Sequence, residues 1–206
     1  AKTILLVSTV LITAGIIVGV LNLTGLGINL SAGLVEVSGG NTLILLWLAA
    51  ITCMVLGMEM TTAGAYMLLA ILVAPALVSL GLIPIAVHMF VFYWGLSALI
   101  TPPVCGGTYV AASIANAPPF KTGWQATALG IVTYIVPFMF IYNPGILMIG
   151  SAVEIVLTFI STLIGIIALA VAIEGYLLTR VNIGERILFL GGAVALIVPG
   201  WLTDII

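Results

Sequence analysis

A short polar segment flanked by glycines interrupts a long, uncharged, apolar part of the chain. This segment reads Gly-Met-Glu-Met-Thr-Thr-Ala-Gly over Gly57–Gly64. The apolar arm before it, from Asn41, has roughly 16 residues, whereas a spanning helix needs about 20. The pattern therefore predicts a re-entrant helical hairpin over 41–81, with its polar tip at membrane depth inside protein. The alternative is two ordinary spans joined by a short loop in water, with Glu59 solvated.

The composition supports a membrane setting for this hairpin. Of the 206 residues, 64% are hydrophobic and 5% are charged, whereas about a quarter of the residues are charged in a soluble domain. The apolar runs are continuous, so we expect an all-α integral membrane protein rather than a β-barrel. The net charge of −2 gives no basic surface for nucleic acid, but the lipid bilayer is an expected partner. Because the chain starts at Ala1 and is hydrophobic by Thr3, we expect it to be a piece of a longer protein.

A second polar break interrupts the apolar stretch over 84–115. It reads Thr-Pro-Pro-Val-Cys-Gly-Gly-Thr over Thr101–Thr108. The two prolines remove backbone donors, and the two glycines permit backbone shapes that other residues resist. We expect a discontinuous helix, with helical parts over 85–100 and 109–115. At such a break, freed carbonyls can coordinate a cation and a half-helix N-terminus can face an anion, unless the prolines only shape the packing.

The two breaks divide the chain into three expected parts. Residues 1–40 hold a spanning helix, Thr3–Leu21, and an interfacial arm helix. Residues 41–115 form a transport half-domain, made of the hairpin over 41–81 and the broken helix over 84–115. Residues 116–206 hold the C-terminal transmembrane helices. In this last part we expect loops over 116–123 and 174–186 and spans over 124–142, 146–173 and 187–206.

The basic residues give an orientation. If Lys2 is cytoplasmic and the hairpin enters from and leaves to the outside, then Lys121, Arg180 and Arg186 all fall on the cytoplasmic side. This agrees with the positive-inside rule.

The residues around both breaks resemble a known family. Gly57–Tyr66 resembles the second-repeat hairpin of the large membrane subunit of TRAP transporters (tripartite ATP-independent periplasmic transporters). Ile100–Val104, followed by Tyr109–Ala115, is similar to that family's second broken helix. Tyr134–Pro144 and the two extra spans resemble the fused permeases that pair with TAXI-type binding proteins. The resemblance covers essentially the whole chain.

The resemblance implies an elevator-type, inverted-repeat transporter in a bacterial or archaeal cytoplasmic membrane. It implies ion-gradient-driven uptake of a small organic acid, a carboxylate, which a soluble extracytoplasmic TAXI-type binding protein delivers. No second polar tip and no second Thr-Pro-Pro break follow Tyr142, so this chain is expected to be one half of the design. The N-terminal repeat, and a small membrane subunit or fused domain, would then be further partners.

The resemblance also implies where the transported ion and substrate bind. The hairpin tip would lie beside the second break, and hydroxyl and carbonyl oxygens from both would bind Na⁺. The expected Na⁺ ligands include Thr61, Thr62 and Thr101. The full set of candidates for ion and substrate binding is Gly57, Glu59, Thr61, Thr62, Thr101, Pro102, Pro103, Gly106 and Thr108.

Glu59 departs from the family pattern. The usual tip reads closer to Gly-Met-Gly-x-Pro-Thr, so Glu59 replaces a glycine and Thr61 stands where a proline is common. A carboxylate at membrane depth is costly and is functional by default. Our hypothesis is that Glu59 coordinates Na⁺ or carries a coupling proton; the alternative is that it reaches water at the mouth of a cavity. The coupling ion, Na⁺ or H⁺, therefore stays open.

Two other functions compete with transport. One is a non-transporting membrane subunit that scaffolds a complex, which would not need two oxygen-rich breaks facing each other. The other is a membrane-embedded enzyme with Glu59 and His88 as acid and base, but no His/Glu pair has metal spacing and no nucleophile elbow is present. We therefore expect no enzyme, and no cofactor apart from the coupling ion. His88 is expected to be a packing histidine, and Glu154 to reach water from the end of its span.

Overall fold

The computed structural model contains helices throughout the part of the chain that it describes. Apart from them, the described residues hold an isolated antiparallel bridge between Tyr176 and Arg180. The all-α expectation is confirmed. The expected span Thr3–Leu21 lies mostly outside the described residues, as do Lys2 and Glu59. The described residues are 12, 15–16, 19–21, 23–58, 60–177 and 179–197.

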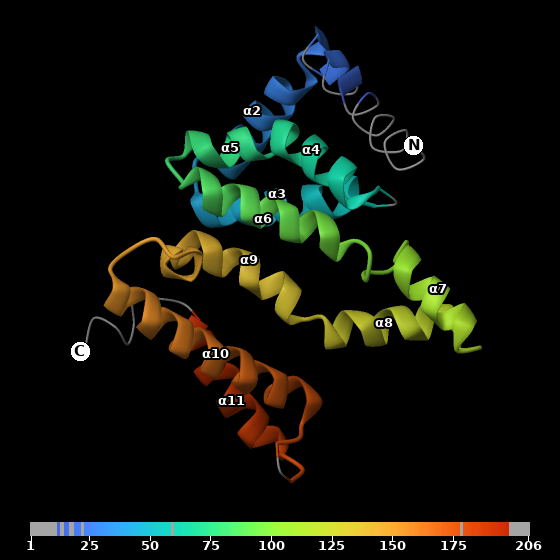
Figure 1. Cartoon of the computed structure of the whole chain (residues 1–206), viewed down its shortest axis with the longest axis vertical. Coiled ribbons are helices and arrows are strands. Elements are labelled where there is room, and N and C mark those ends of the chain that lie inside the picture. The colour runs from blue at the N-terminus through green and yellow to red at the C-terminus, as the bar shows by residue number, and fades with distance from the viewer. Residues whose placement is uncertain are drawn as a thin grey trace, which may run out of the picture. The chain divides into compact units, whose positions relative to one another are not determined.

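Figure 1 follows the helices along the chain from blue to red. They are α2 (Leu26–Ser38), α3 (Thr42–Leu56), α4 (Thr62–Leu72), α5 (Ala74–Ser79), α6 (Pro84–Ser97), α7 (Gly106–Ile114), α8 (Pro119–Leu129), α9 (Val132–Tyr142), the 3₁₀ helix η1 (Pro144–Leu147), α10 (Ala152–Glu174) and α11 (Ile183–Ile197).

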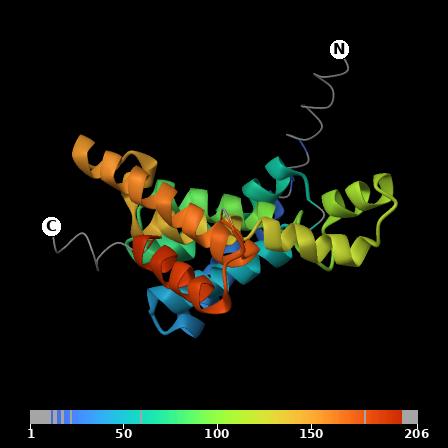
Figure 2. The ribbon, with the colours of Figure 1, turned by 90° about the horizontal axis from the view of Figure 1, so that it is seen from below.

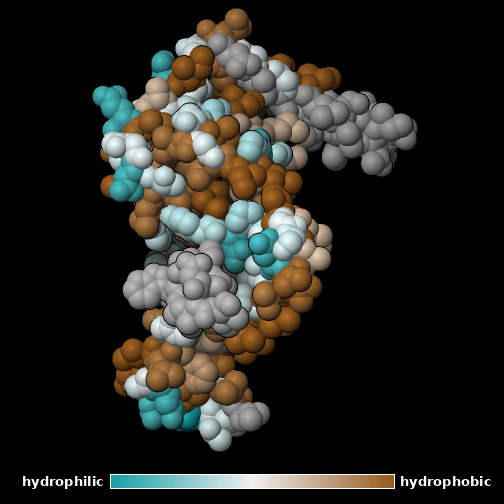
Figure 3. Space-filling model, turned by 90° about the vertical axis from the view of Figure 1, so that its left-hand side faces the viewer, coloured by the Kyte–Doolittle hydropathy of each residue, from teal (hydrophilic) through white to brown (hydrophobic). Residues whose placement is uncertain are grey.

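Within the described part of the chain, three helical segments are long and apolar enough to cross a membrane. They are Thr62–Ser79, Pro119–Tyr142 and Ala152–Glu174. Apolar side chains also cover much of the face in Figure 3, as expected for a surface that meets lipid. These features are those of a multi-pass membrane protein.

The two arms of the hairpin differ in length. The first arm, α3, has 15 residues and is therefore shorter than the hydrocarbon core of a bilayer. The second arm, α4 with α5, has 18 residues and is long enough to cross. Length therefore supports a re-entrant helix for the first arm, whereas we expected two short arms.

The chain forms two compact units. Unit 1 comprises Ala1–Thr127 and unit 2 comprises Ala128–Ile206. The division expected at residues 40 and 115 concerns function rather than compactness. These two units do not test it, and it stays a prediction.

The core of unit 1 lies between α3, α4, α5 and α6, and α2 covers α3, α4 and α5. This core combines small side chains with large ones, and small residues let helix backbones approach closely in a membrane protein. The largest fully buried side chains include Leu45, Leu46, Leu69, Leu77 and Phe90, and the small buried ones include Ala49, Ala50, Ala65 and Ala86.

Local signals explain the ends of the two hairpin arms. Asn41 caps the first arm, because its side-chain oxygen accepts hydrogen bonds from the backbone N–H groups of Leu43 (3.0 Å) and Ile44 (3.2 Å). The second arm is interrupted between α4 and α5, because Pro75 lacks an N–H and its ring crowds the carbonyl of Ile71.

Unit 2 contains α9, η1 and the pair of α10 and α11, which lie side by side in Figures 1 and 2. Its core contains Met139, Leu169 and Ala193. The expected spans differ at their ends. The span expected over 124–142 consists of α8 and α9, and α8 begins within the expected loop, at Pro119, a residue that suits the first helical position.

The helix expected over 146–173 begins later, at Ala152. A capping box explains this start: the N–H of Glu154 donates to Ser151 Oγ (3.3 Å), and the N–H of Ser151 donates to Glu154 Oε2 (2.8 Å). Glu154 is thus exposed in the first turn, which agrees with its expected contact with water.

The last described helix begins earlier than expected, at Ile183 rather than 187. Two reciprocal hydrogen bonds explain this start. The N–H of Asn182 donates to Glu185 Oε2, and the N–H of Glu185 donates to Asn182 Oδ1, both at 2.9 Å. Arg186 therefore lies in the first turn of α11, where its guanidinium donates to the carbonyls of Ala172 (2.7 Å) and Ile173 (2.6 Å) at the end of α10.

Candidate transport site

The hairpin tip is built by two helix ends. The first arm ends at Leu56 and the second begins at Thr62. Thr61 caps the second arm, because its Oγ1 accepts a hydrogen bond from the backbone N–H of Gly64 (3.3 Å). Thr61 and Thr62 are both exposed. Glu59, which departs from the family pattern, lies outside the described residues, so its proposed roles stay hypotheses.

The tip is attached to α6 by two glycines. Gly57 is buried, and a Cβ atom on it would overlap the backbone oxygen of Gly95 in α6. A Cβ atom on Gly95 would in turn lie 2.5 Å from Cδ1 of Leu69 in α4. The end of α3, the second arm and the last turns of α6 therefore meet at Gly95. In Figure 1 the α3–α4 turn and the end of α6 lie at the same end of these helices.

The second break begins directly after that end of α6. The helix ends at Ser97, three residues before the expected end at Ile100. The reason is local, because Pro102 and Pro103 offer no N–H to the carbonyls four residues earlier. The last turn tightens instead, since the N–H of Ile100 donates to the carbonyl of Ser97 (3.1 Å), only three residues back.

The helix after the break starts at Gly106 rather than at Tyr109. The carbonyl of Cys105 accepts from the N–H groups of Thr108 (3.0 Å) and Tyr109 (3.1 Å), which closes the first turn of α7. Gly106 and Thr108 therefore lie in a helical turn and not in the unwound segment. Thr108 is buried, with 7% of its surface exposed.

The unwound segment itself carries Thr101, Pro102 and Pro103. The peptide between the two prolines is cis. Thr101 is half-buried, and its Oγ1 donates to the carbonyl of Ser97 at 2.5 Å. The hydrogen bonds described for Thr61 and Thr101 thus connect each of them to its own segment. The approach of the tip threonines to Thr101 stays a prediction.

A third element also contacts the break. Thr127 of α8 lies with its Oγ1 3.1 Å from the carbonyl of Ile100 and 3.1 Å from that of Gly123 in its own helix. A Cβ atom on Gly123 would lie 3.0 Å from the sulfur of Cys105 and 3.1 Å from Cγ of Pro102. The middle and the last turn of α8 therefore pack directly on the break.

The sequence prediction missed Gly95, Gly123 and Thr127. The sequence holds two weak signals for them. Gly123 and Thr127 are four residues apart and therefore share one helix face. Gly95 interrupts a helical pattern, and a glycine there often has a packing reason. Neither signal says which distant segment the residue touches.

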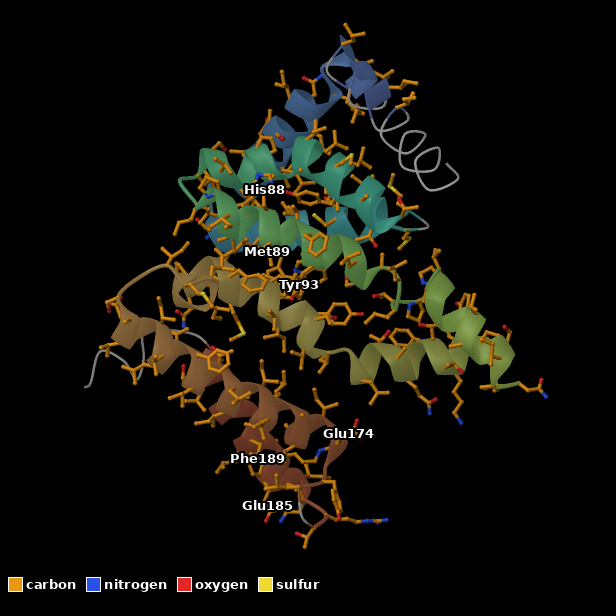
Figure 4. The ribbon with its side chains drawn as sticks, viewed as in Figure 1. His88, Met89, Tyr93, Glu174, Glu185 and Phe189 are labelled. Carbon is orange, nitrogen blue, oxygen red and sulfur yellow. The ribbon has the colours of Figure 1, made fainter. Side chains whose placement is uncertain are left out.

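His88 has a defined partner on the neighbouring arm. Its Nδ1 lies 3.2 Å from the hydroxyl of Tyr66 in α4, and the two rings meet edge to face with centroids 6.0 Å apart. Figure 4 shows His88 on the side of α6 that faces α4, whereas Met89 and Tyr93 point away from α4. This contact agrees with a packing histidine that links the two helices.

Comparisons with known proteins support the resemblance at the level of the family. A family model described as "Tripartite ATP-independent periplasmic transporter, DctM component" matches residues 1–155. No curated protein and no solved structure matches the chain. Members of this family are transporter components rather than enzymes, and they work with a periplasmic binding protein and a small membrane subunit. The match covers most of the chain, and both breaks lie within it. The chain therefore belongs to the family of the DctM component of tripartite ATP-independent periplasmic transporters.

Proposed function

We propose that this chain forms one half of the transport site of an Na⁺-coupled importer of a small organic acid. The observation that carries the proposal is the contact between Gly57 and Gly95. It brings a tip rich in hydroxyls to the end of α6, which is also where the second break begins. Two oxygen-rich segments in one compact unit suit a hard cation of single charge.

The carboxylate would be recognised by helix ends. The sequence has four basic residues, Lys2, Lys121, Arg180 and Arg186, and none lies within either break. The N-termini of α4 and α7 each carry partial positive charge at a break. We propose that these ends bind the carboxylate together with a second, inverted repeat, and that a TAXI-type binding protein delivers the substrate to this elevator-type assembly.

The test is uptake by the complete transporter, reconstituted in proteoliposomes with its binding protein. A Na⁺ gradient is compared with a proton gradient for a panel of small carboxylates. We expect Na⁺-driven uptake that Thr62→Val weakens through a higher half-saturating Na⁺ concentration. The matched control is Thr52→Val in α3, because the hydroxyl of Thr52 bonds to the carbonyl of Leu48 in its own helix at 2.8 Å and to no other residue in the described ranges.

Two other outcomes would change the assignment. Proton-driven uptake that is lost in Glu59→Gln would make the carboxylate at the tip the coupling group. Absence of gradient-driven uptake for every carboxylate would favour the scaffold function instead.

A further inference from the structure

The second break lacks some of the backbone hydrogen bonds that normally hold a helix. Pro102 and Pro103 have no N–H, so the carbonyls of Ala98 and Leu99 lose their usual helical donors. In a membrane protein, side-chain hydroxyls of neighbouring helices often replace such donors. Hydroxyls that bond to the carbonyls bordering the unwound segment, rather than to those of Ala98 and Leu99, set how the remaining oxygen atoms of the break are oriented.

Two hydroxyls reach the break from outside the unwound segment. Thr127 Oγ1 lies 3.1 Å from the carbonyl oxygen of Ile100, which is 27 residues earlier in the chain. The hydroxyl of Tyr109 donates to the carbonyl of Pro103 at 2.6 Å. The two acceptors, Ile100 and Pro103, stand directly before and directly after the Thr101-Pro102 dipeptide.

We propose that Thr127 and Tyr109 are positioning residues of the ion site, which rests on the Na⁺-coupled function proposed above. They hold the backbone on both sides of Thr101 and Pro102. The hydroxyl of Thr101 and the carbonyl between the two prolines are thereby kept in one orientation. Neither Thr127 nor Tyr109 needs to contact the ion.

The packing of α8 against the break supports this role. Gly123 lies one helical turn before Thr127, and a side chain there would press on Cys105 and Pro102. The absence of a side chain at Gly123 thus brings the hydroxyl of Thr127 within reach of Ile100. Thr127 also has an acceptor in its own helix, the carbonyl of Gly123 at 3.1 Å, so helix stability alone does not require the contact with Ile100.

The chain offers a matched control in the same helix. Thr122 is half-buried like Thr127, but its hydroxyl donates to the carbonyl of Pro118 in the adjoining turn, at 2.9 Å, and to no other described residue. Replacing either threonine by valine removes a hydroxyl from α8 and keeps the shape of the side chain. Only the variant at position 127 loses the contact with the break.

The experiment measures the half-saturating Na⁺ concentration and the maximal rate of uptake in the reconstituted complete transporter. It also measures the Na⁺-induced rise in melting temperature of the purified protein. We expect Thr127→Val and Tyr109→Phe each to raise half-saturating Na⁺ roughly fivefold, as the loss of one hydrogen bond would. Their melting temperatures without Na⁺ should stay near that of the parent. Thr127→Ser should restore the parent value, and Thr122→Val should not change it.

Three results would overturn the inference. The positioning role would be wrong if the half-saturating Na⁺ concentration stayed within twofold of the parent value in both Thr127→Val and Tyr109→Phe. That result would leave Na⁺ coupling itself intact. A lower melting temperature with an unchanged half-saturating Na⁺ concentration would make both residues merely structural. A parent protein without Na⁺-driven uptake would instead overturn the proposed function, and this inference with it. If Thr127→Val does not fold, Thr127→Ser and Tyr109→Phe still decide between these results.

Discussion

Gly57 at the end of the first hairpin arm lies directly against the backbone of Gly95 in α6, and no side chain fits between them. The two glycines are far apart in the sequence and bring two helix ends together. Because the tip follows Gly57 and the second break follows the end of α6, this contact determines how close the two polar segments can come. Several consequences can be measured.

Alanine at these glycines should destabilise the protein, and more so at position 57. A Cβ atom on Gly57 meets backbone atoms of Gly95 and Cys53, which cannot move cheaply, whereas a Cβ atom on Gly95 meets the mobile end of Leu69. Overpacking of this kind costs about 1–3 kcal/mol. We expect Gly95→Ala to fall within that range and Gly57→Ala at or above its upper end, as measured by unfolding in detergent.

The control for this pair is Gly33→Ala in α2. A Cβ atom there meets no described atom within 4 Å outside its own stretch of helix backbone, and alanine favours a helix over glycine by roughly 0.5–1 kcal/mol. Gly33→Ala should therefore be neutral or stabilising. Equal losses of stability at positions 33 and 57 would contradict the close contact.

The hydrogen bond between Tyr66 and His88 should contribute modestly to the packing of α4 on α6. Interhelical hydrogen bonds in membrane proteins average about 0.6 kcal/mol in double-mutant cycles. We expect a coupling free energy of that size in a cycle of Tyr66→Phe and His88→Gln, measured by unfolding in detergent. If His88→Gln changed the proton dependence of uptake while Tyr66→Phe did not, His88 would have a role beyond packing.

The capping box of α10 should stabilise unit 2. Replacing a serine N-cap by alanine typically costs about 1 kcal/mol, so Ser151→Ala should lower the unfolding free energy by about that amount. The control is Ser161→Ala, since the hydroxyl of Ser161 bonds to the carbonyl of Thr158 within the same helix, at 3.0 Å, and to nothing else among the residues described. A larger loss at Ser161 than at Ser151 would contradict the assigned helix start.

Arg186 should stabilise the connection between α10 and α11. Its two hydrogen bonds satisfy carbonyls at the C-terminus of α10, where positive charge is also favourable. We expect Arg186→Gln to lower the unfolding free energy by about 1–3 kcal/mol. Arg186→Lys should recover only part of it, because lysine lacks the planar fork. Arg180→Gln, at an exposed position in the same connection, should have little effect.

Much of the fold could be predicted because its signals are local. Asn41 begins the first arm where the sequence suggested, and the two prolines after Thr101 break their helix. The errors were also local. Hydropathy placed the start of α10 too early, although the Ser151-x-x-Glu154 pair marks the observed start. The end of α6 was placed too late, because a proline also removes a hydrogen bond from the turn before it.

Composition and short residue patterns are enough to establish the membrane class, the two polar breaks, the helix caps and the resemblance that led to the family. Each depends on composition or on residues a few positions apart, where propensity and hydrogen bonding act within one helix. The contact of Gly57 with Gly95 and that of Thr127 with Ile100 are visible only in the folded chain. Such contacts depend on which helix faces meet, and that results from packing the whole core rather than from any short segment.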